Sequence, residues 1–173
     1  GTKSYLAPGT TGQVCTIDGT GAPSWAAAAG GESGWFNSTT LMKVMPTEFM
    51  ANSTSKFLYI DDGTTDKVSV KCNDGRTTFE AYAIKAIPTG YKATHVQVYG
   101  NNANSTSNCV TVRNHDHTDS DLTNTTSGNM NTNINITDIT SSATQNILIK
   151  VTLSSSHVGQ DNLYGADITI AAV

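Results

Sequence analysis

Charged side chains are scarce in this chain, and they do not gather into a basic cluster. Asp, Glu, Lys and Arg make up 14% of the 173 residues, and the formal net charge is −4. Proteins that bind nucleic acid irrespective of its sequence need a basic face that neutralises phosphates. The composition therefore argues against nucleic acid as a partner.

Long apolar runs are also missing. No stretch reaches the roughly 20 residues that a membrane-spanning helix needs, so we expect no membrane insertion. No segment resembles a secretory signal peptide. The chain begins at Gly1 without a methionine, as expected for a processed chain or for a piece of a longer one.

Cysteine is rare, and the three residues Cys15, Cys72 and Cys109 are far apart. An odd number of cysteines without paired spacing argues against a disulfide framework. We expect free thiols, which fits assembly in a reducing cytoplasm.

Short alternating segments rich in β-branched residues fill most of the chain after Trp35. Strands are expected at residues 41–45, 56–60, 67–72, 78–87, 94–99, 109–112, 133–137, 146–153 and 166–171. A helical interpretation of residues 79–87 is weaker, because Pro88 and the flanking β-branched residues favour a strand. The absence of a helical period predicts an all-β fold, an antiparallel β-sandwich of jelly-roll type.

The first residues show a different pattern. Residues 13–17 and a segment ending at Trp25 are typical of two short strands around a tight Asp18-Gly19 turn, since both turn residues accept positive φ. This hairpin is too small and too rich in glycine to bury a core by itself. An alanine- and glycine-rich stretch follows it and is expected to be a linker. We therefore divide the chain into a hairpin and linker, 1–34, and a sandwich head, 35–173.

The N-terminal motif carries a resemblance to a known family. The pattern Gly-x-x-Gly-Gln-Val-x-x-x-Asp-Gly-x-Gly-x-Pro-x-Trp, residues 9–25, resembles a module of tailed-phage tail-fibre and related virion proteins. Residues 86–100, 138–151 and 164–170 look like the terminal domain of such proteins. The resemblance implies a non-enzymatic structural protein of a bacteriophage virion, assembled in the cytoplasm of the host bacterium.

Within this family, the chain is expected to form a homotrimeric tail fibre or spike whose C-terminal head serves host-surface attachment. Its partners would be further copies of itself, other phage virion proteins and host-surface glycan. The hairpin would act as a trimer clasp, with oligomerisation through Gln13, Val14, Ile17 and Trp25.

Three other functions remain open at this stage. A capsid decoration or head-fibre protein would share the same features. A polysaccharide-depolymerising enzyme would need two carboxylates in one cleft, with Glu48 and Glu80 as candidates. A soluble lectin unrelated to phage is the third. No nucleophile elbow, phosphate loop or zinc-protease motif is present, so we predict that the chain is not an enzyme.

The densest polar segment, residues 113–121, contains His115 and His117. The simpler interpretation is a solvated loop after the strand 109–112, with no cofactor. The alternative is a divalent metal on a threefold axis, where the His-x-His pairs of three chains would supply six nitrogens. Asp116, Asp119 and Asp121 lack the glycine and glutamate of an EF-hand calcium loop.

Exposed aromatic rings would suit carbohydrate, because they combine apolar area with a polar tip. The candidates are Trp35, Phe36, Phe57, Tyr59, Tyr82, Tyr91, Tyr99 and Tyr164. We expect Phe57, Phe79 and Tyr82 in the core, and Tyr91, beside a turn glycine, as the best exposed ring. The amide-rich loops 101–108 and 124–133 are further candidates, and we name Tyr91, Asn101, Asn102 and Asn104 as ligand-binding residues.

Overall fold

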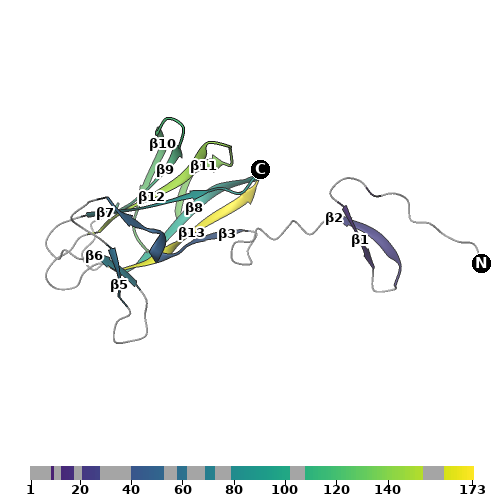
Figure 1. Ribbon diagram of the computed structural model, residues 1–173, viewed down its shortest axis with the longest axis horizontal. Helices are drawn as coiled ribbons and strands as arrows, with labels where there is room; N and C mark the ends of the chain where they lie inside the picture. The colour runs from purple at the N-terminus through teal and green to yellow at the C-terminus, as the bar shows by residue number, and fades with distance from the viewer. Residues whose placement is uncertain are drawn as a thin grey trace, which may run out of the picture. The chain divides into compact units, whose positions relative to one another are not determined.

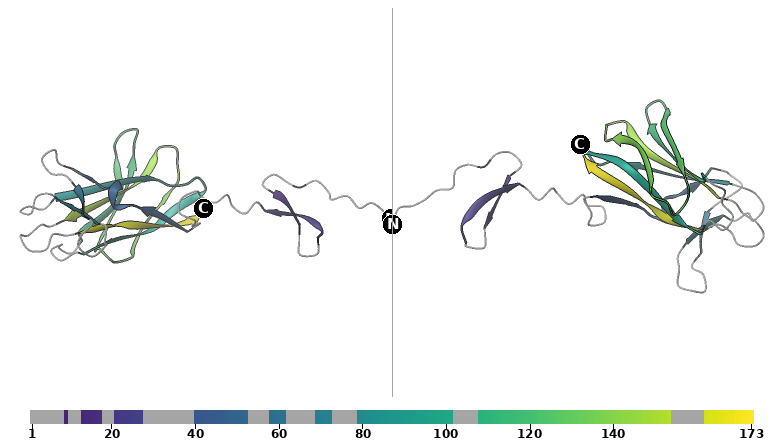
Figure 2. Two further views of the ribbon diagram at one scale, coloured as in Figure 1. Left: turned by 60° about the horizontal axis from the view of Figure 1, so that its bottom comes forward. Right: turned by 180° about the vertical axis from the view of Figure 1, so that it is seen from behind.

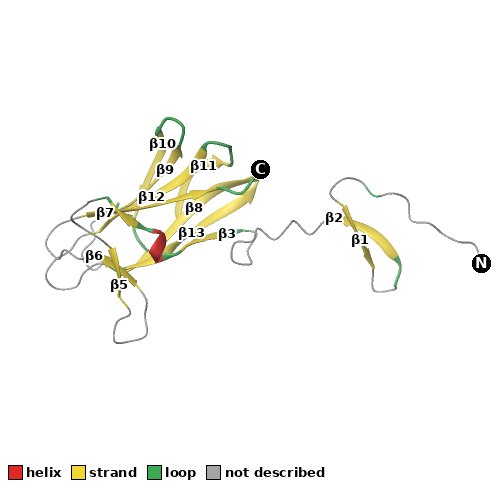
Figure 3. Cartoon of the chain, viewed as in Figure 1, coloured by secondary structure: helices red, strands yellow, loops and turns green. Residues whose placement is uncertain are grey.

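The chain forms two compact units, Gly1–Thr39 and Thr40–Val173, in a computed structural model (Figure 1). The structure describes residue 9 and residues 13–17, 21–27, 40–52, 58–61, 69–72, 79–101, 108–153 and 162–173. The boundary expected between residues 34 and 35 lies outside these ranges. Among the described residues, the one helical element is the 3₁₀ turn η1 (Pro46–Glu48), and the rest of the regular structure is β-strand (Figure 3).

The N-terminal unit contains an antiparallel hairpin of β1 (Gln13–Ile17) and β2 (Pro23–Ala27). The strand expected at residues 13–17 is confirmed. Ile17 pairs with Pro23, so the five residues 18–22 separate the strands. A two-residue turn at Asp18-Gly19 would pair Ile17 with Thr20 instead. The tight turn that we expected is therefore wrong in length.

Side-chain parity gives a physical reason for the longer connection. The observed register keeps Trp25 on the same face as Ile17 and Pro23, and it sets Thr16 opposite Ser24 on the other face. The hydroxyl oxygens of Thr16 and Ser24 lie 3.2 Å apart. A two-residue turn would change the parity and move Trp25 to the face of Thr16. The observed register thus keeps Ile17, Pro23 and Trp25 together on one face, while the paired residues Val14 and Ala26 have the opposite parity.

The head consists of two antiparallel sheets, seen from two further directions in Figure 2. The strand order of the first sheet is β10 (Leu122–Gly128), β9 (Val110–Asp116), β12 (Gln145–Leu153), β7 (Phe79–Ala86) and β4 (Met50–Ala51). The order of the second is β11 (Ile134–Thr140), β8 (Tyr91–Gly100), β13 (Leu163–Ala172), β6 (Ser69–Cys72) and β5 (Leu58–Asp61). β3 (Leu41–Val44) also pairs with β13.

The strand order is that of a jelly roll. Eight strands, β3 and β7 to β13, make up its two four-stranded layers, β3-β13-β8-β11 and β7-β12-β9-β10. Numbered from first to eighth along the chain, the layers read 1-8-3-6 and 2-7-4-5, which is the double Greek-key arrangement. The all-β sandwich and its jelly-roll character are confirmed.

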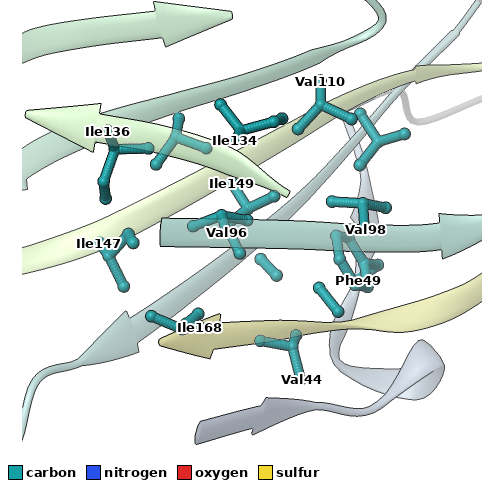
Figure 4. Packing of buried hydrophobic residues seen from close by; sticks show 14 of the residues in the cluster. Val44, Phe49, Val96, Val98, Val110, Ile134, Ile136, Ile147, Ile149 and Ile168 are labelled. Carbon is teal, nitrogen blue, oxygen red and sulfur yellow. The ribbon is translucent and has the colours of Figure 1, made fainter. Parts of the chain in front are cut away.

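Apolar side chains from both layers meet between the sheets (Figure 4). β8 buries Val96 and Val98 and turns His95 and Gln97 outward, as its alternation predicts. Ile149 of β12 and Ile168 of β13 are almost completely buried from opposite layers. Each such side chain contributes roughly 1.5–3 kcal/mol. The head therefore contains its own hydrophobic core.

Two polar segments that we expected to be loops belong to strands. Residues 113–116 continue β9 beyond Val112, where we expected a solvated loop, and β10 covers much of the expected loop 124–133. β10 is an edge strand whose Thr, Asn and Ser side chains face mostly solvent. Its register shifts between Thr123 and Thr126, and Asn124 has a positive φ of 52°. A polar, bulged edge strand has no apolar alternation that sequence patterns can detect.

The aromatic side chain of Tyr82 also differs from expectation. On β7, Ala81 and Ala83 point into the core, so Tyr82 faces outward and is half-buried. The expected core position of Tyr82 is wrong because strand parity outweighs side-chain size. Phe57 and the side chain of Phe79 lie outside the described residues.

Candidate functional site

A hollow of about 260 Å³ opens where β3 ends beside β13 and β8. Its lining includes Lys43 from β3, Met45 directly after β3, Tyr99 from β8, and Tyr164 and Asp167 from β13. The five residues come from chain segments far apart in sequence, which the jelly-roll topology brings to one sheet face.

A break in the edge pairing of β13 creates this hollow. β3 pairs with β13 only as far as Val44, and Pro46, which has no N–H to donate, turns the chain away. β6 resumes the pairing at Leu163. Between these points Leu163 pairs with Gly100 and Gly165 pairs with Tyr99 of β8, so Tyr164 is an extra residue in β13 and forms a β-bulge.

Gly165 is required for the bulge. Its φ of 124° lies in a region that residues with a Cβ rarely adopt. A Cβ at this position would lie 2.6 Å from the carbonyl oxygen of Val44. Glycine thus lets β13 pass close to the end of β3 while the neighbouring Tyr164 is left 41% exposed.

The polar groups of the hollow are held in place by the sheet. The Tyr99 hydroxyl donates a hydrogen bond of 3.0 Å to Oδ2 of Asp167. Burial, and then this bond to a carboxylate, raise the pKa of Tyr99 above its ordinary value, so its phenol keeps its proton at neutral pH. Asp167 stands opposite Lys43 on one neighbouring strand and opposite Gln97 on the other.

The predicted ligand residues do not come together. Tyr91, the first residue of β8, is half-buried and packs against the hydrophobic core, where we expected an exposed ring. Asn101 follows the other end of β8, and its Oδ1 accepts a 2.7 Å hydrogen bond from the backbone N–H of Asn162. A ten-residue strand spans about 30 Å, so Tyr91 and Asn101 belong to opposite ends of the head. Asn102 and Asn104 lie outside the described residues.

The two histidines lie where β9 passes into its turn. His115 is in β9 and His117 follows it, with Nδ1 of His117 3.3 Å from Nδ2 of Asn146. Nδ1 of His115 is buried and makes no hydrogen bond to the described part of the chain. The described ranges of one chain contain no group of three or more His, Cys, Asp or Glu side chains suited to a metal. The metal site shared by three chains therefore stays a prediction.

The neighbouring aspartates organise the turn after β9. Oδ1 of Asp116 accepts hydrogen bonds from the hydroxyl and the backbone N–H of Thr118, at 2.7 and 2.9 Å. These bonds, the hydroxyl first, lower the pKa of Asp116 below its ordinary value. Oδ1 of Asp119 accepts from the backbone N–H of Asp121 at 2.9 Å. The carboxylates therefore have a local structural role.

The predicted clasp residues lie on the hairpin. Ile17 is 74% exposed and Trp25 38% exposed, on the same face, and Gln13 is exposed. The side chain of Val14 is outside what the structure describes. A Cβ on Gly9 would lie 2.6 Å from the Trp25 ring, so the backbone of Gly9 packs directly against the indole. This contact explains why the motif has glycine at its first position.

The two candidate catalytic carboxylates are separated and paired with lysines. Glu48 forms an ion pair with Lys85 of β7. Lys85 has the same parity on β7 as the buried Ala81 and Ala83, whereas Glu80 has the opposite parity and faces outward. Glu80 lies 2.8 Å from the Lys150 ammonium and accepts a 2.7 Å hydrogen bond from the Tyr82 hydroxyl. These contacts, with Lys150 the largest, lower the pKa of Glu80, which suits a permanent carboxylate rather than a general acid.

Tyr99 and Tyr164 are among the aromatic candidates in the sequence, although Tyr91 was the expected binding ring. A usable signal was the Tyr164-Gly165 pair directly before the expected strand 166–171, because a glycine within or beside a strand often marks a bulge. The role of Asp167 had no signal in the sequence, since it depends on the register between β13 and β8.

Comparison with known proteins adds no identification. No protein-family model matches the chain, and no curated protein matches it either. In the described residues, no helix is long and apolar enough to cross a membrane.

Proposed function

We propose that the chain is a non-enzymatic structural protein of a tailed-phage particle, a homotrimeric tail fibre or spike. In this proposal the N-terminal hairpin holds three chains together, and the jelly-roll head makes the attachment to the host surface. The protein is assembled in the bacterial cytoplasm and works as part of the virion. The resemblance of residues 9–25 to virion modules supports this assignment.

The exposed apolar face of the hairpin is the observation that carries the proposal. Ile17 and Trp25 lie on this face, and Cys15, which pairs with Trp25, is exposed as well. A two-stranded hairpin is at best marginally stable alone in water. Burying Ile17 and Trp25 against neighbouring copies would contribute roughly 1.5–3 kcal/mol for each fully covered side chain. A trimer contact at this face therefore suits both the exposure and the small size of the hairpin.

Native mass spectrometry of the purified chain at micromolar concentration tests this proposal. We expect a trimer for the unaltered chain and dissociation to monomers for Ile17→Asp, because a carboxylate on the apolar face would be buried without a partner. Ser24→Asp adds the same charge to the opposite face and should remain trimeric. A monomeric unaltered chain contradicts the trimer, and equal dissociation of both variants contradicts the assigned face.

Decoration of the capsid is the second candidate, and the fold favours it because jelly rolls are frequent in viral capsid proteins. Immunogold labelling of intact particles separates the two candidates: gold on the tail supports the fibre or spike, and gold on the capsid supports decoration.

The non-enzymatic part of the proposal is supported by the lysine partners of Glu48 and Glu80. A glycosidase keeps one carboxyl group protonated to act as general acid. The lowered pKa of Glu80 works against that role.

A further inference from the structure

We propose that the hollow between β3, β13 and β8 binds one uncharged pyranose ring of a saccharide, which stacks on Tyr164 and hydrogen-bonds to Asp167 and Tyr99. This inference deepens the attachment role proposed above and rests on it for its biological purpose.

The stacking surface is the ring of Tyr164. It is 41% exposed at the edge of the hollow, and the bulge at Gly165 gives it this position. β-bulges commonly re-aim a side chain next to a functional site. The C–H face of a sugar ring is apolar and the edge of the ring carries hydroxyls, so an aromatic face beside polar groups matches both parts. A second tyrosine, Tyr99, lines the same hollow.

The hydrogen-bonding groups are positioned before any ligand arrives. The Tyr99 hydroxyl donates to Oδ2 of Asp167, which fixes both side chains on the outer face of the sheet. A carboxylate accepts up to about four hydrogen bonds, so Asp167 has capacity for neighbouring sugar hydroxyls beyond the one from Tyr99. Hydrogen bonds to an ionised group are stronger than those between neutral groups. Groups held in place in advance lose less entropy on binding.

The charges of the lining favour a neutral ligand. Lys43 and Asp167 are the charged residues among those that line the hollow, and their charges cancel. A uronic acid or a phosphate would bring a second negative charge beside Asp167. The volume of about 260 Å³ falls just below the roughly 300–1,000 Å³ of ordinary small-ligand pockets. The hollow therefore suits a single ring of a longer glycan.

Titration of the 173-residue chain with simple glycosides tests the site. The probes are methyl α-glucoside, methyl α-galactoside, methyl α-mannoside and N-acetylglucosamine, with methyl glucuronide as the charged comparison. Saturation-transfer NMR detects binding and calorimetry gives its strength. We expect saturable binding of at least one neutral probe and binding of the glucuronide weaker by about ten-fold, as one unfavourable charge contact would cause.

Variants assign the binding to the hollow. Tyr164→Ala should weaken binding at least about ten-fold, whereas Tyr164→Phe, which keeps the ring, should bind nearly as well. Asp167→Asn and Tyr99→Phe should each weaken binding, Asp167→Asn by about ten-fold because it removes a charged acceptor. Tyr82→Ala, on the outer face of the other sheet, is the control and should bind as the unaltered chain does. Thermal unfolding of each variant checks that the head remains folded.

Three results would overturn the inference: no neutral probe binds at millimolar concentration, the glucuronide binds more tightly than every neutral probe, or binding persists in Tyr164→Ala and Asp167→Asn. These failures are distinct from failure of the proposed function. A trimer found on phage particles that binds no glycoside rejects the saccharide site alone. A monomer that binds glycosides through Tyr164 keeps the site and rejects the fibre, as for a soluble lectin.

Discussion

The hairpin and the head use their apolar residues in opposite ways. In the hairpin, Ile17 and Trp25 lie on an exposed face, whereas in the head residues such as Ile149 and Ile168 are almost completely buried between two sheets. The difference shows where each unit obtains its stability. The head has a core within one chain, whereas a two-stranded hairpin is at best marginally stable by itself, and we therefore propose that further copies of the chain cover its exposed face.

The two units also differ in how specific their sequences are. The hairpin motif contains residues set by single contacts, such as Gly9 against the ring of Trp25. The strands of the head follow a generic alternation that many different side chains would satisfy. The sequence of the hairpin is therefore easier to recognise than that of the head, although the hairpin has no core of its own.

The sharpest test of this difference is to shorten an isoleucine in each unit. Ile168→Ala should destabilise the head by about 2–5 kcal/mol, because it removes buried methyl groups and leaves a cavity. Ile17→Ala should leave unfolding of the head unchanged within about 0.5 kcal/mol and should instead weaken the trimer that we propose. Urea unfolding followed by circular dichroism measures the first effect, and mass measurement over a dilution series measures the second.

If Ile17→Ala lowered the unfolding midpoint of the head as much as Ile168→Ala does, the two units would not be energetically separate. Ile84→Ala provides a matched control in the head, since Ile84 is substantially exposed and should cost little.

The alternation of apolar residues made the fold class predictable, because in an antiparallel sheet it reports directly which side chains are buried. This explains why β8 buries Val96 and Val98 while His95 and Gln97 face outward. β10 was missed because a polar edge strand takes its structure from pairing with β9 and buries little apolar area of its own. In the jelly-roll order β9 lies between β10 and β12. Pairing with these two neighbours extends β9 through residues 113–116, where we expected a loop.

The candidate site could be predicted only in part. The sequence indicates which aromatic residues are available, but Tyr99 and Tyr164 come to line the same hollow through pairing between β8 and β13, segments more than 60 residues apart. The hollow also requires β3 to leave the edge of β13 after Val44. Long-range register of this kind has no local signal.

The glycines of the two units give a second test, with a smaller effect. Gly165→Ala should destabilise the head by about 1–3 kcal/mol, because the φ of 124° is unfavourable for alanine and the new Cβ would meet the backbone oxygen of Val44. Gly9→Ala would instead meet the side chain of Trp25, which is able to rotate away, and should not affect unfolding of the head. Differential scanning calorimetry of both variants measures the contrast. A Gly165→Ala protein as stable as the parent would contradict the close approach of β13 to β3.

The smallest expected effect is a loss of stability of the head in acid, through the ion pair of Glu80 and Lys150. β1 and β2 contain no acidic, basic or histidine residue, whereas the head carries Glu80 with its lysine partner Lys150. The Lys150 contact lowers the pKa of Glu80 in the folded head, so the stabilisation is complete above the ordinary glutamate pKa and is lost as the pH falls through the lowered value. Because the pair is partly exposed to solvent, we expect a contribution of about 0.5 kcal/mol.

Glu80→Gln tests this effect, since it removes the charge while keeping a hydrogen-bond acceptor near Tyr82. The parent and the variant should differ in urea midpoint at pH 7, and the difference should shrink as the pH is lowered below the glutamate range. High salt at pH 7 should reduce it as well, because screening weakens a partly exposed ion pair. A difference that grew on acidification would mean that the folded head binds the proton of Glu80 more tightly than the unfolded chain, opposite to the direction that the Lys150 contact imposes.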